Sequence, residues 1–267
     1  MRFWRASLAL LLALLFASPV AADPTAAPTA ARSFATKAGL KIGIIGLDNR
    51  VPADSAQWPW IAIGRLNREV GGHCTAALIG ARKVLTAAHC LFNTNTQRWA
   101  LPDEVHFVAG YQRGKFREHA VGRDFMISPD WDPKQAKSTA NIENDWAVIE
   151  LERSLSIRPI PLSHLDFEET KAASEDGELT IAAYNGDYGE ILTRDKGCEL
   201  AGQSEDGRLL LHECDATFGA SGAPLLLATP AGAEIVGLQS AVIENQDGSR
   251  YGAAVPVETI RDGAGLD

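Results

Sequence analysis

The chain has 267 residues, of which 46% are hydrophobic and 22% are charged. This length allows one or two domains with a substantial buried core. Twenty-five basic residues against 34 acidic ones give a formal net charge of −9. An acidic protein binds nucleic acid poorly, so we expect no nucleic-acid partner.

The first 22 residues have the three parts of a signal peptide. Residues 1–5 are basic, residues 6–17 are apolar, and residues 20–22 form a small-residue cleavage site. The apolar run is shorter than the roughly 20 residues that cross a bilayer, so we expect cleavage rather than a retained anchor. The mature protein is therefore predicted to be secreted or periplasmic, without membrane contact. Residues 23–40 are rich in Ala, Pro and Thr and are predicted to be a linker or short propeptide.

The remaining sequence predicts an all-β fold. Short apolar or alternating runs, bounded by turn residues, are typical of barrels and sandwiches. The predicted strands are 60–66, 75–79, 83–86, 104–109 and 146–151, then 179–184, 191–194, 209–213, 224–227, 234–241 and 251–256. The break between the two series, at 154–174, contains prolines that disfavour a central strand. We interpret 166–178 as an exposed loop, and the two series indicate two barrels.

Three short segments contain a histidine, an aspartate and a serine in distinctive surroundings: Leu-Thr-Ala-Ala-His-Cys at 85–90, Asp-Trp-Ala-Val-Ile at 145–149 and Gly-Ala-Ser-Gly-Ala-Pro at 219–224. Each residue alone could be structural. A serine hydroxyl is a weak nucleophile near neutral pH and needs an adjacent base. His89 is the candidate base for Ser221, and Asp145 would fix the imidazole tautomer and stabilise its charged form.

The glycines around Ser221 predict a second functional element. Glycine adopts backbone angles that other residues avoid, so the amides of Gly219 and Ser221 can converge on one point. Such a point is an oxyanion hole, where the loss of one donor typically costs roughly 3–4 kcal/mol of transition-state stabilisation. The three segments together therefore predict a nucleophilic hydrolase.

These segments resemble the histidine, aspartate and serine motifs of chymotrypsin-fold, trypsin-like serine proteases. The order His, Asp, Ser is that of this family, whereas subtilisin-like enzymes and α/β-hydrolases have other orders. The resemblance is to the bacterial branch, which is related to glutamyl endopeptidases. It implies two six-stranded antiparallel β-barrels, at residues 41–160 and 161–267, with the active site in the cleft between them.

The four cysteines, Cys74, Cys90, Cys198 and Cys214, allow three pairings. The resemblance implies a Cys74–Cys90 disulfide beside His89, which leaves Cys198 to pair with Cys214. Export to an oxidising environment agrees with disulfides. The alternative is a zinc site, since the dipeptide His-Cys occurs at both 73–74 and 89–90. The resemblance implies neither a metal nor another cofactor.

Asp215 is the first candidate for substrate specificity. It lies six residues before Ser221, at the position that binds Lys or Arg at the base of the primary pocket in trypsin-like relatives. The alternative is that Asp215 accepts hydrogen bonds within its loop. Ala220 stands where digestive relatives have an aspartate, so we predict that activation does not bury a new N-terminus in a salt bridge.

The other candidates are on two later strands. Gln239, Ser240 and Val242 match the strand that holds the substrate backbone, and Gly252 matches the facing wall. Gln239 replaces a histidine of glutamyl endopeptidases, which weakens a glutamyl preference, and Val242 narrows the mouth of the pocket. Cleavage after basic residues is the favoured prediction, with glutamyl or small-residue preference as alternatives.

The sequence therefore predicts a secreted, monomeric serine endopeptidase that hydrolyses protein or peptide substrates through an acyl-enzyme. A different class of function stays open, because a fold does not guarantee an activity. The chain could be a protease-fold binding protein that does not use its site.

Overall fold

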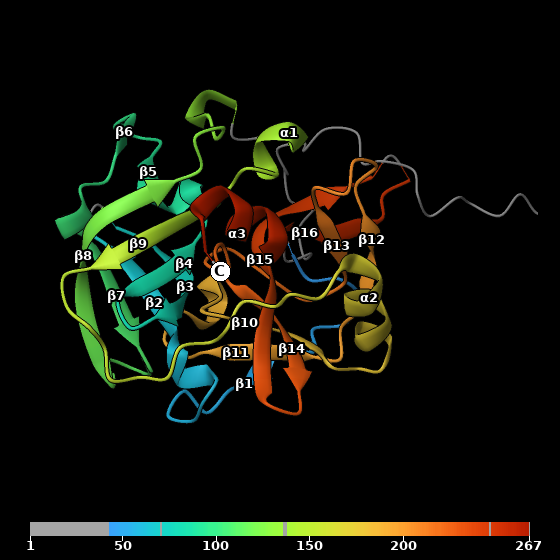
Figure 1. The fold of residues 1–267 in the computed structure, drawn as a ribbon, viewed down its shortest axis with the longest axis horizontal. Helices are drawn as coiled ribbons and strands as arrows, with labels where there is room; N and C mark the ends of the chain where they lie inside the picture. The colour runs from blue at the N-terminus through green and yellow to red at the C-terminus, as the bar shows by residue number, and fades with distance from the viewer. Residues whose placement is uncertain (1–42, 70, 136–137, 246, 267) are drawn as a thin grey trace, which may run out of the picture.

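The computed structural model describes residues 43–266, apart from residues 70, 136–137 and 246. The predicted signal peptide and linker lie outside the described residues. Two β-structures lie side by side, the first mainly teal to green and the second mainly orange to red (Figure 1). This confirms the predicted all-β, two-barrel architecture.

The first half of the chain forms a closed six-stranded antiparallel barrel with the strand order β2-β3-β4-β9-β8-β7. Its strands are β2 (Ile63–Arg68), β3 (His73–Gly80), β4 (Lys83–Thr86), β7 (Val105–Ala109), β8 (Glu118–Ile127) and β9 (Ala147–Leu151). The barrel interior is filled by apolar side chains such as Leu66, Phe107 and Ile149, which are buried. The sequence did not predict β8, because its charged residues interrupt the apolar alternation.

The second half forms an eight-stranded sheet in the order β1-β11-β10-β14-β15-β16-β13-β12. Its strands are β1 (Val51–Pro52), β10 (Leu179–Ala183), β11 (Thr193–Lys196), β12 (Leu200–Gln203), β13 (Leu210–His212), β14 (Pro224–Thr229), β15 (Gly232–Glu244) and β16 (Arg250–Pro256). The strand count exceeds the expected six partly because β1, from the start of the described chain, pairs with β11. The N-terminal segment therefore crosses to the second half.

Short elements connect the strands. The helices are α1 (Thr139–Ile142), α2 (Phe167–Glu175) and α3 (Val257–Ala264); the 3-10 turns are η1 (Trp60–Ala62), η2 (Ala88–Leu91), η3 (Pro102–Glu104), η4 (Pro133–Gln135) and η5 (Gly186–Tyr188); β5 (Phe92–Asn93) pairs with β6 (Arg98–Trp99). Helix α2 corrects the prediction of a loop at 166–178. Asp166 and Glu169 form a reciprocal capping box there, a signal present in the sequence.

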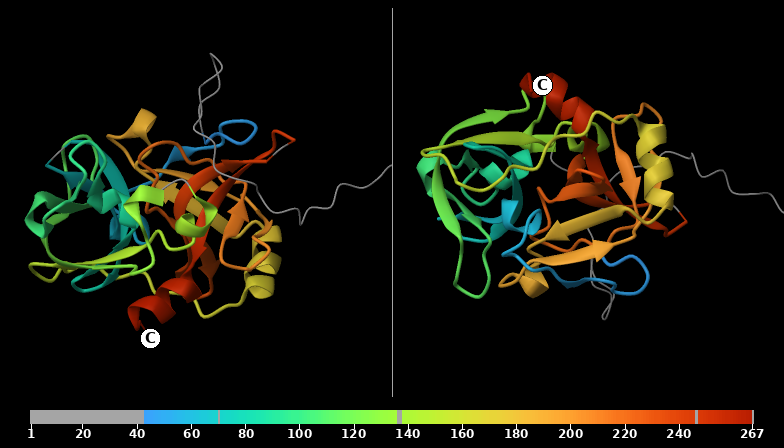
Figure 2. Two further views of the ribbon diagram at one scale, coloured as in Figure 1. Left: turned by 90° about the horizontal axis from the view of Figure 1, so that it is seen from above. Right: turned by 60° about the horizontal axis from the view of Figure 1, so that its bottom comes forward.

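The two halves share a core that includes the C-terminal helix. Ile260 of α3 packs in one cluster with Leu85 and Trp146 from the first half and Leu238 from the second. Figure 2 shows α3 between the two β-structures. Because α3 packs against residues of both halves, the junction between them is held by a shared apolar cluster.

Both predicted disulfides are present. Cys74 bonds to Cys90 and Cys198 bonds to Cys214. The first ties β3 to η2, and the second ties the segments before β12 and after β13. Of the helices in the described part of the chain, none has the length and apolar character to cross a membrane.

Candidate active site

His89 and Asp145 meet because β4 and β9 are neighbours in the first barrel. Thr86 pairs with Ala147, so the ends of the two strands place η2 beside the residue that precedes β9. Asp145 Oδ2 is 2.6 Å from His89 Nδ1, and Asp145 Oδ1 accepts the backbone N–H of His89 at 2.8 Å. A carboxylate can only accept, so Nδ1 carries a proton and Nε2 keeps a lone pair when the ring is neutral.

The surroundings of this pair keep the Asp145 carboxylate ionised and make the His89 imidazole more basic. Burial alone would raise the pKa of the Asp145 carboxyl, but the charge and hydrogen bonds of His89 and a hydrogen bond from Ser240 hold it below its usual range. Burial alone would lower the pKa of His89, but Asp145 raises it above 6.5 against the opposing charge of Arg68. Asp145 therefore stays ionised while His89 is able to accept a proton.

The second sheet contributes a further donor to this pair. The pairing of β15 with β16 shifts register between Gln239 and Ala241, which leaves Ser240 in a bulge. The Ser240 hydroxyl donates to Asp145 Oδ2. Ser240, which the sequence predicts to bind substrate, therefore helps to orient the candidate catalytic aspartate.

Ser221 lies in the loop before β14 and lines one cavity of about 580 Å³ together with His89 and Asp145. Its carbonyl accepts the backbone N–H of Thr75 at 2.9 Å, which fixes the loop to the first barrel. In the described part of the chain, the Ser221 hydroxyl makes no hydrogen bond to His89. Such bonds often close only when a substrate is present.

The backbone around Gly219 is arranged as an oxyanion hole requires. Gly219 has a φ of +90°, and a Cβ there would lie 2.5 Å from the Tyr184 carbonyl oxygen, so the position needs glycine. The Phe218 carbonyl accepts the N–H of Gly186, which keeps that oxygen away from Ser221. Within the described residues, the N–H groups of Gly219 and Ser221 have no acceptor and are free to bind one.

Comparison with known proteins agrees with this geometry. The sequence profile of the family described as "Trypsin" matches residues 47–263. The chain belongs to the trypsin family. The predicted relation to chymotrypsin-fold serine proteases is thereby confirmed.

The individual relatives of this trypsin-family chain are distant. A chymotrypsin of Phaedon cochleariae is 35% identical over 98 residues, which are 36% of this chain and 32% of the relative. The CLIP domain-containing serine protease B14 of Anopheles gambiae is 28% identical over 148 residues, 48% of this chain and 39% of the relative. The matched segments therefore span between about a third and two fifths of the length of these relatives.

Solved structures support the fold. A Glu endopeptidase in complex with MPD has a TM-score of 0.61 and 23% identity, and the match covers 83% of this chain and 99% of that one. The VesB protease of Vibrio cholerae has a TM-score of 0.59 and 22% identity, over 80% and 65% of the two chains. At this identity the likeness establishes a shared fold only.

Asp215 takes the second of the two roles that the sequence left open. Its carboxylate accepts the backbone N–H of Ile45 at 2.7 Å and that of Asn49 at 2.9 Å. It is 1% exposed and is not among the residues that line the cavity at Ser221. The carboxylate therefore holds the backbone of residues 45–49, and it is not one of the described residues that could contact a Lys or Arg side chain in this cavity.

The other predicted specificity residues divide between the cavity and its support. Gln239, Ser240 and Val242 line the cavity, whereas Gly252 pairs with Val242 behind it. A Cβ on Gly252 would lie 2.0 Å from the imidazole of His212, so only glycine leaves room for that ring.

Sequence reasoning missed His212. It is fully buried, and its Nε2 is 2.6 Å from Gln239 Oε1 while its Nδ1 accepts the N–H of Cys214. The Gln239 amide is oriented by donating to Ala241 O at 2.7 Å. Burial lowers the pKa of His212 to about 4, so a neutral His212–Gln239 pair supports the cavity wall.

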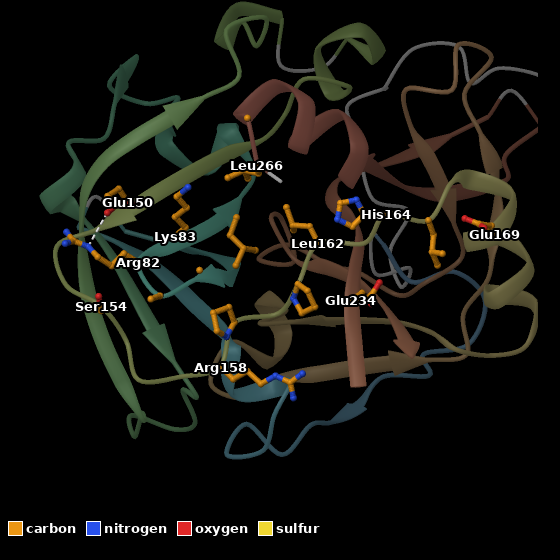
Figure 3. A pocket seen from close by; sticks show the side chains of 17 residues that line it. Arg82, Lys83, Glu150, Ser154, Arg158, Leu162, His164, Glu169, Glu234 and Leu266 are labelled. Atoms are coloured by element: carbon orange, nitrogen blue, oxygen red, sulfur yellow. Dashed lines mark ion pairs between the residues drawn. The ribbon is translucent and has the colours of Figure 1, made fainter. Parts of the chain in front are cut away.

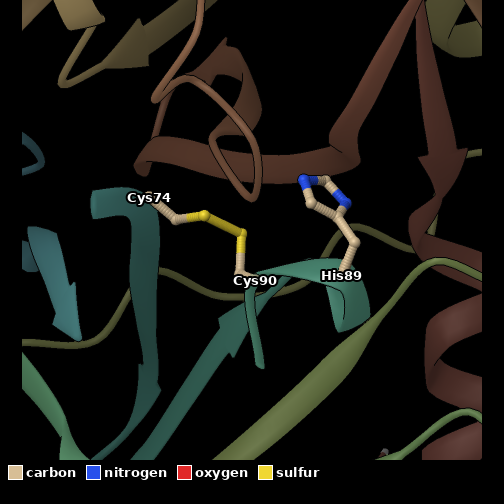
Figure 4. A group of neighbouring side chains, drawn as sticks. All are labelled: Cys74, His89 and Cys90. Atoms are coloured by element: carbon tan, nitrogen blue, oxygen red, sulfur yellow. A yellow bond between two sulfur atoms is a disulfide. The ribbon is translucent and has the colours of Figure 1, made fainter. Parts of the chain in front are cut away.

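The zinc alternative does not fit the cysteines. Cys74, His89 and Cys90 are neighbours, but the two sulfur atoms are bonded to each other (Figure 4). A disulfide sulfur is not the thiolate that zinc requires. The two cysteines of the His-Cys dipeptides are therefore bonded to each other and do not supply zinc ligands.

A larger cavity of about 1260 Å³ lies at the junction of the two halves near Leu266 (Figure 3). It shares no lining residue with the cavity at Ser221. Its charged side chains have both signs, and Arg82 pairs with Glu150 across 3.1 Å. None of the predicted site residues lines it.

Proposed function

We propose that the protein is an exported serine endopeptidase. The observation that carries the proposal is the His89–Asp145 pair in one cavity with Ser221, next to two backbone N–H groups that have no acceptor within the described residues. Family membership supports the same conclusion. Together these features supply a base, its orienting carboxylate, a nucleophile and an anion-binding site.

In the first half of the proposed reaction, Ser221 Oγ attacks the carbonyl carbon of the scissile peptide bond. His89 Nε2 takes the hydroxyl proton, and Asp145 stabilises the resulting imidazolium. The carbonyl oxygen becomes an oxyanion that accepts hydrogen bonds from the N–H groups of Gly219 and Ser221. When the C–N bond breaks, His89 returns the proton to the leaving amine, and an ester with Ser221 remains.

In the second half, a water molecule attacks the ester carbonyl and gives its proton to His89. The tetrahedral intermediate uses the same two N–H donors. Its collapse releases the carboxylic acid and returns the proton to Ser221 Oγ. Apart from this water molecule and the substrate, no group outside the described residues is needed for the atom and proton balance of this cycle.

A fluorophosphonate probe tests the proposal directly. The folded mature protein should be labelled, and Ser221→Ala and His89→Ala should each abolish labelling. Ser154→Ala is the matched control, because this exposed serine lines the other cavity, and it should be labelled at the wild-type rate. Absence of labelling in a folded, correctly processed wild-type protein would favour a protease-fold binding protein.

For specificity, we propose that the residue before the scissile bond has an uncharged side chain. Ala216, Ala220 and Val242 form apolar parts of the cavity wall. Gln239 also lines the cavity, and it forms a neutral pair with the buried His212. A peptide library should show no preference for Lys or Arg, and Asp215→Ser should leave the profile unchanged. A basic preference that disappears in Asp215→Ser, or a preference for Glu, would contradict this part of the proposal.

We also propose export and a monomeric state. The signal-like residues 1–22 and the two disulfides support export. N-terminal sequencing of protein from the periplasm and from the culture medium should find a start after residue 22. Light scattering of that material should give the mass of one chain.

A further inference from the structure

Arg68, at the end of β2, supplies the cavity at Ser221 with a positive charge that the proposed reaction does not use. It is the one Lys or Arg among the described residues that line this cavity. The one carboxylate in the lining, Asp145, is already bonded to His89. The cavity wall therefore presents a cation without an acidic counterpart of its own.

The guanidinium of Arg68 has few partners in the described part of the chain. One terminal nitrogen donates to Cys90 O at 3.3 Å, and the buried Nε has no hydrogen-bond partner. No described carboxylate lies within ion-pairing distance of it. In contrast, six other arginines each pair with a carboxylate: Arg50, Arg82, Arg98, Arg153, Arg208 and Arg250.

The chemistry of this group points to a carboxylate ligand. Partial burial lowers the pKa of Arg68, but an arginine stays protonated in proteins. A partly desolvated charge is unfavourable until a ligand supplies an acceptor. Because Nε is buried, such a ligand would bind the terminal nitrogens of the guanidinium. The planar guanidinium matches a carboxylate better than any neutral group, because two N–H groups can donate to its two oxygens.

The position of Arg68 indicates which part of a substrate it would contact. Ser221 lies between the two halves: the next residue, Gly222, donates to Gln239 O on β15, and Ser221 O accepts from Thr75 on β3. The strand at Gln239 is the one expected to hold the chain before the scissile bond. Arg68 instead donates to Cys90 O of the first barrel. Cys90 directly follows His89, and His89 is the residue that returns the proton to the leaving amine in the proposed reaction. This contact therefore associates Arg68 with the leaving-group side of the scissile bond.

We propose that Arg68 is a specificity residue that binds a carboxylate on the leaving-group side of the scissile bond. This inference rests on the proposed function, since it names a substrate class for the same site. The carboxylate can come from an Asp or Glu side chain shortly after the scissile bond, or from the free C-terminus of a short leaving peptide.

Matched peptides test the proposal. One series is C-terminally amidated and differs only by Glu or Gln at the first, second or third position after the scissile bond. A second series ends at the second position, either as a free acid or as an amide. The wild-type kcat/KM ratio of acid to neutral peptide should be about tenfold or more in at least one matched pair. The series that shows the ratio identifies the source of the carboxylate.

Variants assign this preference to Arg68. In Arg68→Gln the acid-to-neutral ratio should fall to about one, and in Arg68→Glu it should invert, with a Lys peptide preferred over its Gln counterpart. Arg123→Gln removes the same charge from an exposed position on β8 and should keep the wild-type ratio. Because each ratio compares two substrates of one variant, general damage to the site cancels.

The results separate the two proposals. Hydrolysis of all peptides without an acid preference, or a preference that survives in Arg68→Gln, would overturn the role of Arg68 and leave the endopeptidase intact. Absence of hydrolysis together with absence of probe labelling at Ser221 would instead contradict the proposed function. If Arg68→Gln does not fold, Arg68→Lys should fold and show a reduced ratio, because lysine cannot form the paired contact.

Discussion

Asp145 and Asp215 are both buried, with 3% and 1% exposed surface, yet their surroundings differ. Asp145 accepts from a titratable imidazole and a hydroxyl at the junction of the two halves, and these donors hold its pKa below the usual range despite burial. Asp215 accepts from the N–H groups of Ile45 and Asn49, and there burial prevails and raises the pKa. The region of Asp145 is suited to proton transfer, whereas the region of Asp215 fixes backbone.

The largest difference between the regions should appear in catalysis. Asp145→Asn should lower kcat by about 10⁴, because an amide can donate to His89 and favour the wrong imidazole tautomer. Asp215→Asn, which makes the same chemical change in the other region, should keep kcat within a few-fold of wild type. Steady-state kinetics with one peptide substrate measure both. Equal losses in the two variants would mean that Asp215 also acts in the reaction.

The second prediction concerns His212, which lies beside the Asp215 region. Its pKa is about 4 in the folded protein and about 6.5 in an unfolded chain. The unfolded state therefore binds the proton more readily. The contribution of His212 to the free energy of unfolding is complete above pH 6.5 and is lost as the pH decreases to 4. The loss should reach about 3 kcal/mol of unfolding free energy.

Urea unfolding at several pH values checks this dependence, and His212→Gln should flatten it between pH 6.5 and 4. An NMR titration of the wild-type imidazole gives an independent answer if that variant does not fold. A His212 pKa near 6.5 in the folded protein would show that the His212–Gln239 pair is not held neutral by burial.

The third prediction concerns the contribution of Asp215 to the free energy of unfolding. In Asp215→Asn one side-chain oxygen still accepts a backbone N–H, while the new amide group faces the second N–H. We expect a loss of about 1–3 kcal/mol, since one buried donor is left without an acceptor. Urea unfolding of the variant measures it, and hydrogen exchange at Ile45 and Asn49 locates it. Unchanged exchange at both residues would exclude an anchoring role.

These two regions also show what the sequence could and could not predict. The segments with His89, Asp145 and Ser221 are local patterns, and a shared fold places them in one cavity. The partners of Asp215 are more than 160 residues away in sequence. The spacing of six residues between Asp215 and Ser221 therefore could not decide whether Asp215 binds substrate or accepts hydrogen bonds from the backbone. Arg68 and His212 carry no motif at all, and only the packing of β2, β13 and β15 reveals them.

The missed secondary structure has local causes. Strand β8 carries charged residues on a partly exposed surface, which hides the period of two expected of a strand. Helix α2 is polar and short, so the apolar pattern is weak there, and the capping box of Asp166 and Glu169 was the usable signal. Strand β1 has only two residues, and its partner is remote in the chain.

The smallest predicted effect is a shift in the pKa of His89 when a nearby charge is removed. Because Asp145 raises the pKa of His89 above 6.5, kcat/KM for a neutral peptide should fall as the pH decreases through a value above 6.5. Arg68 opposes protonation of His89, so Arg68→Gln should move this acid limb to higher pH. This shift in the pKa of His89 should be smaller than the opposite shift that the closer charge of Asp145 produces. The interaction between two charges falls with distance and is screened by salt. An acid limb that stays in place would mean that the guanidinium is too well solvated to influence the base.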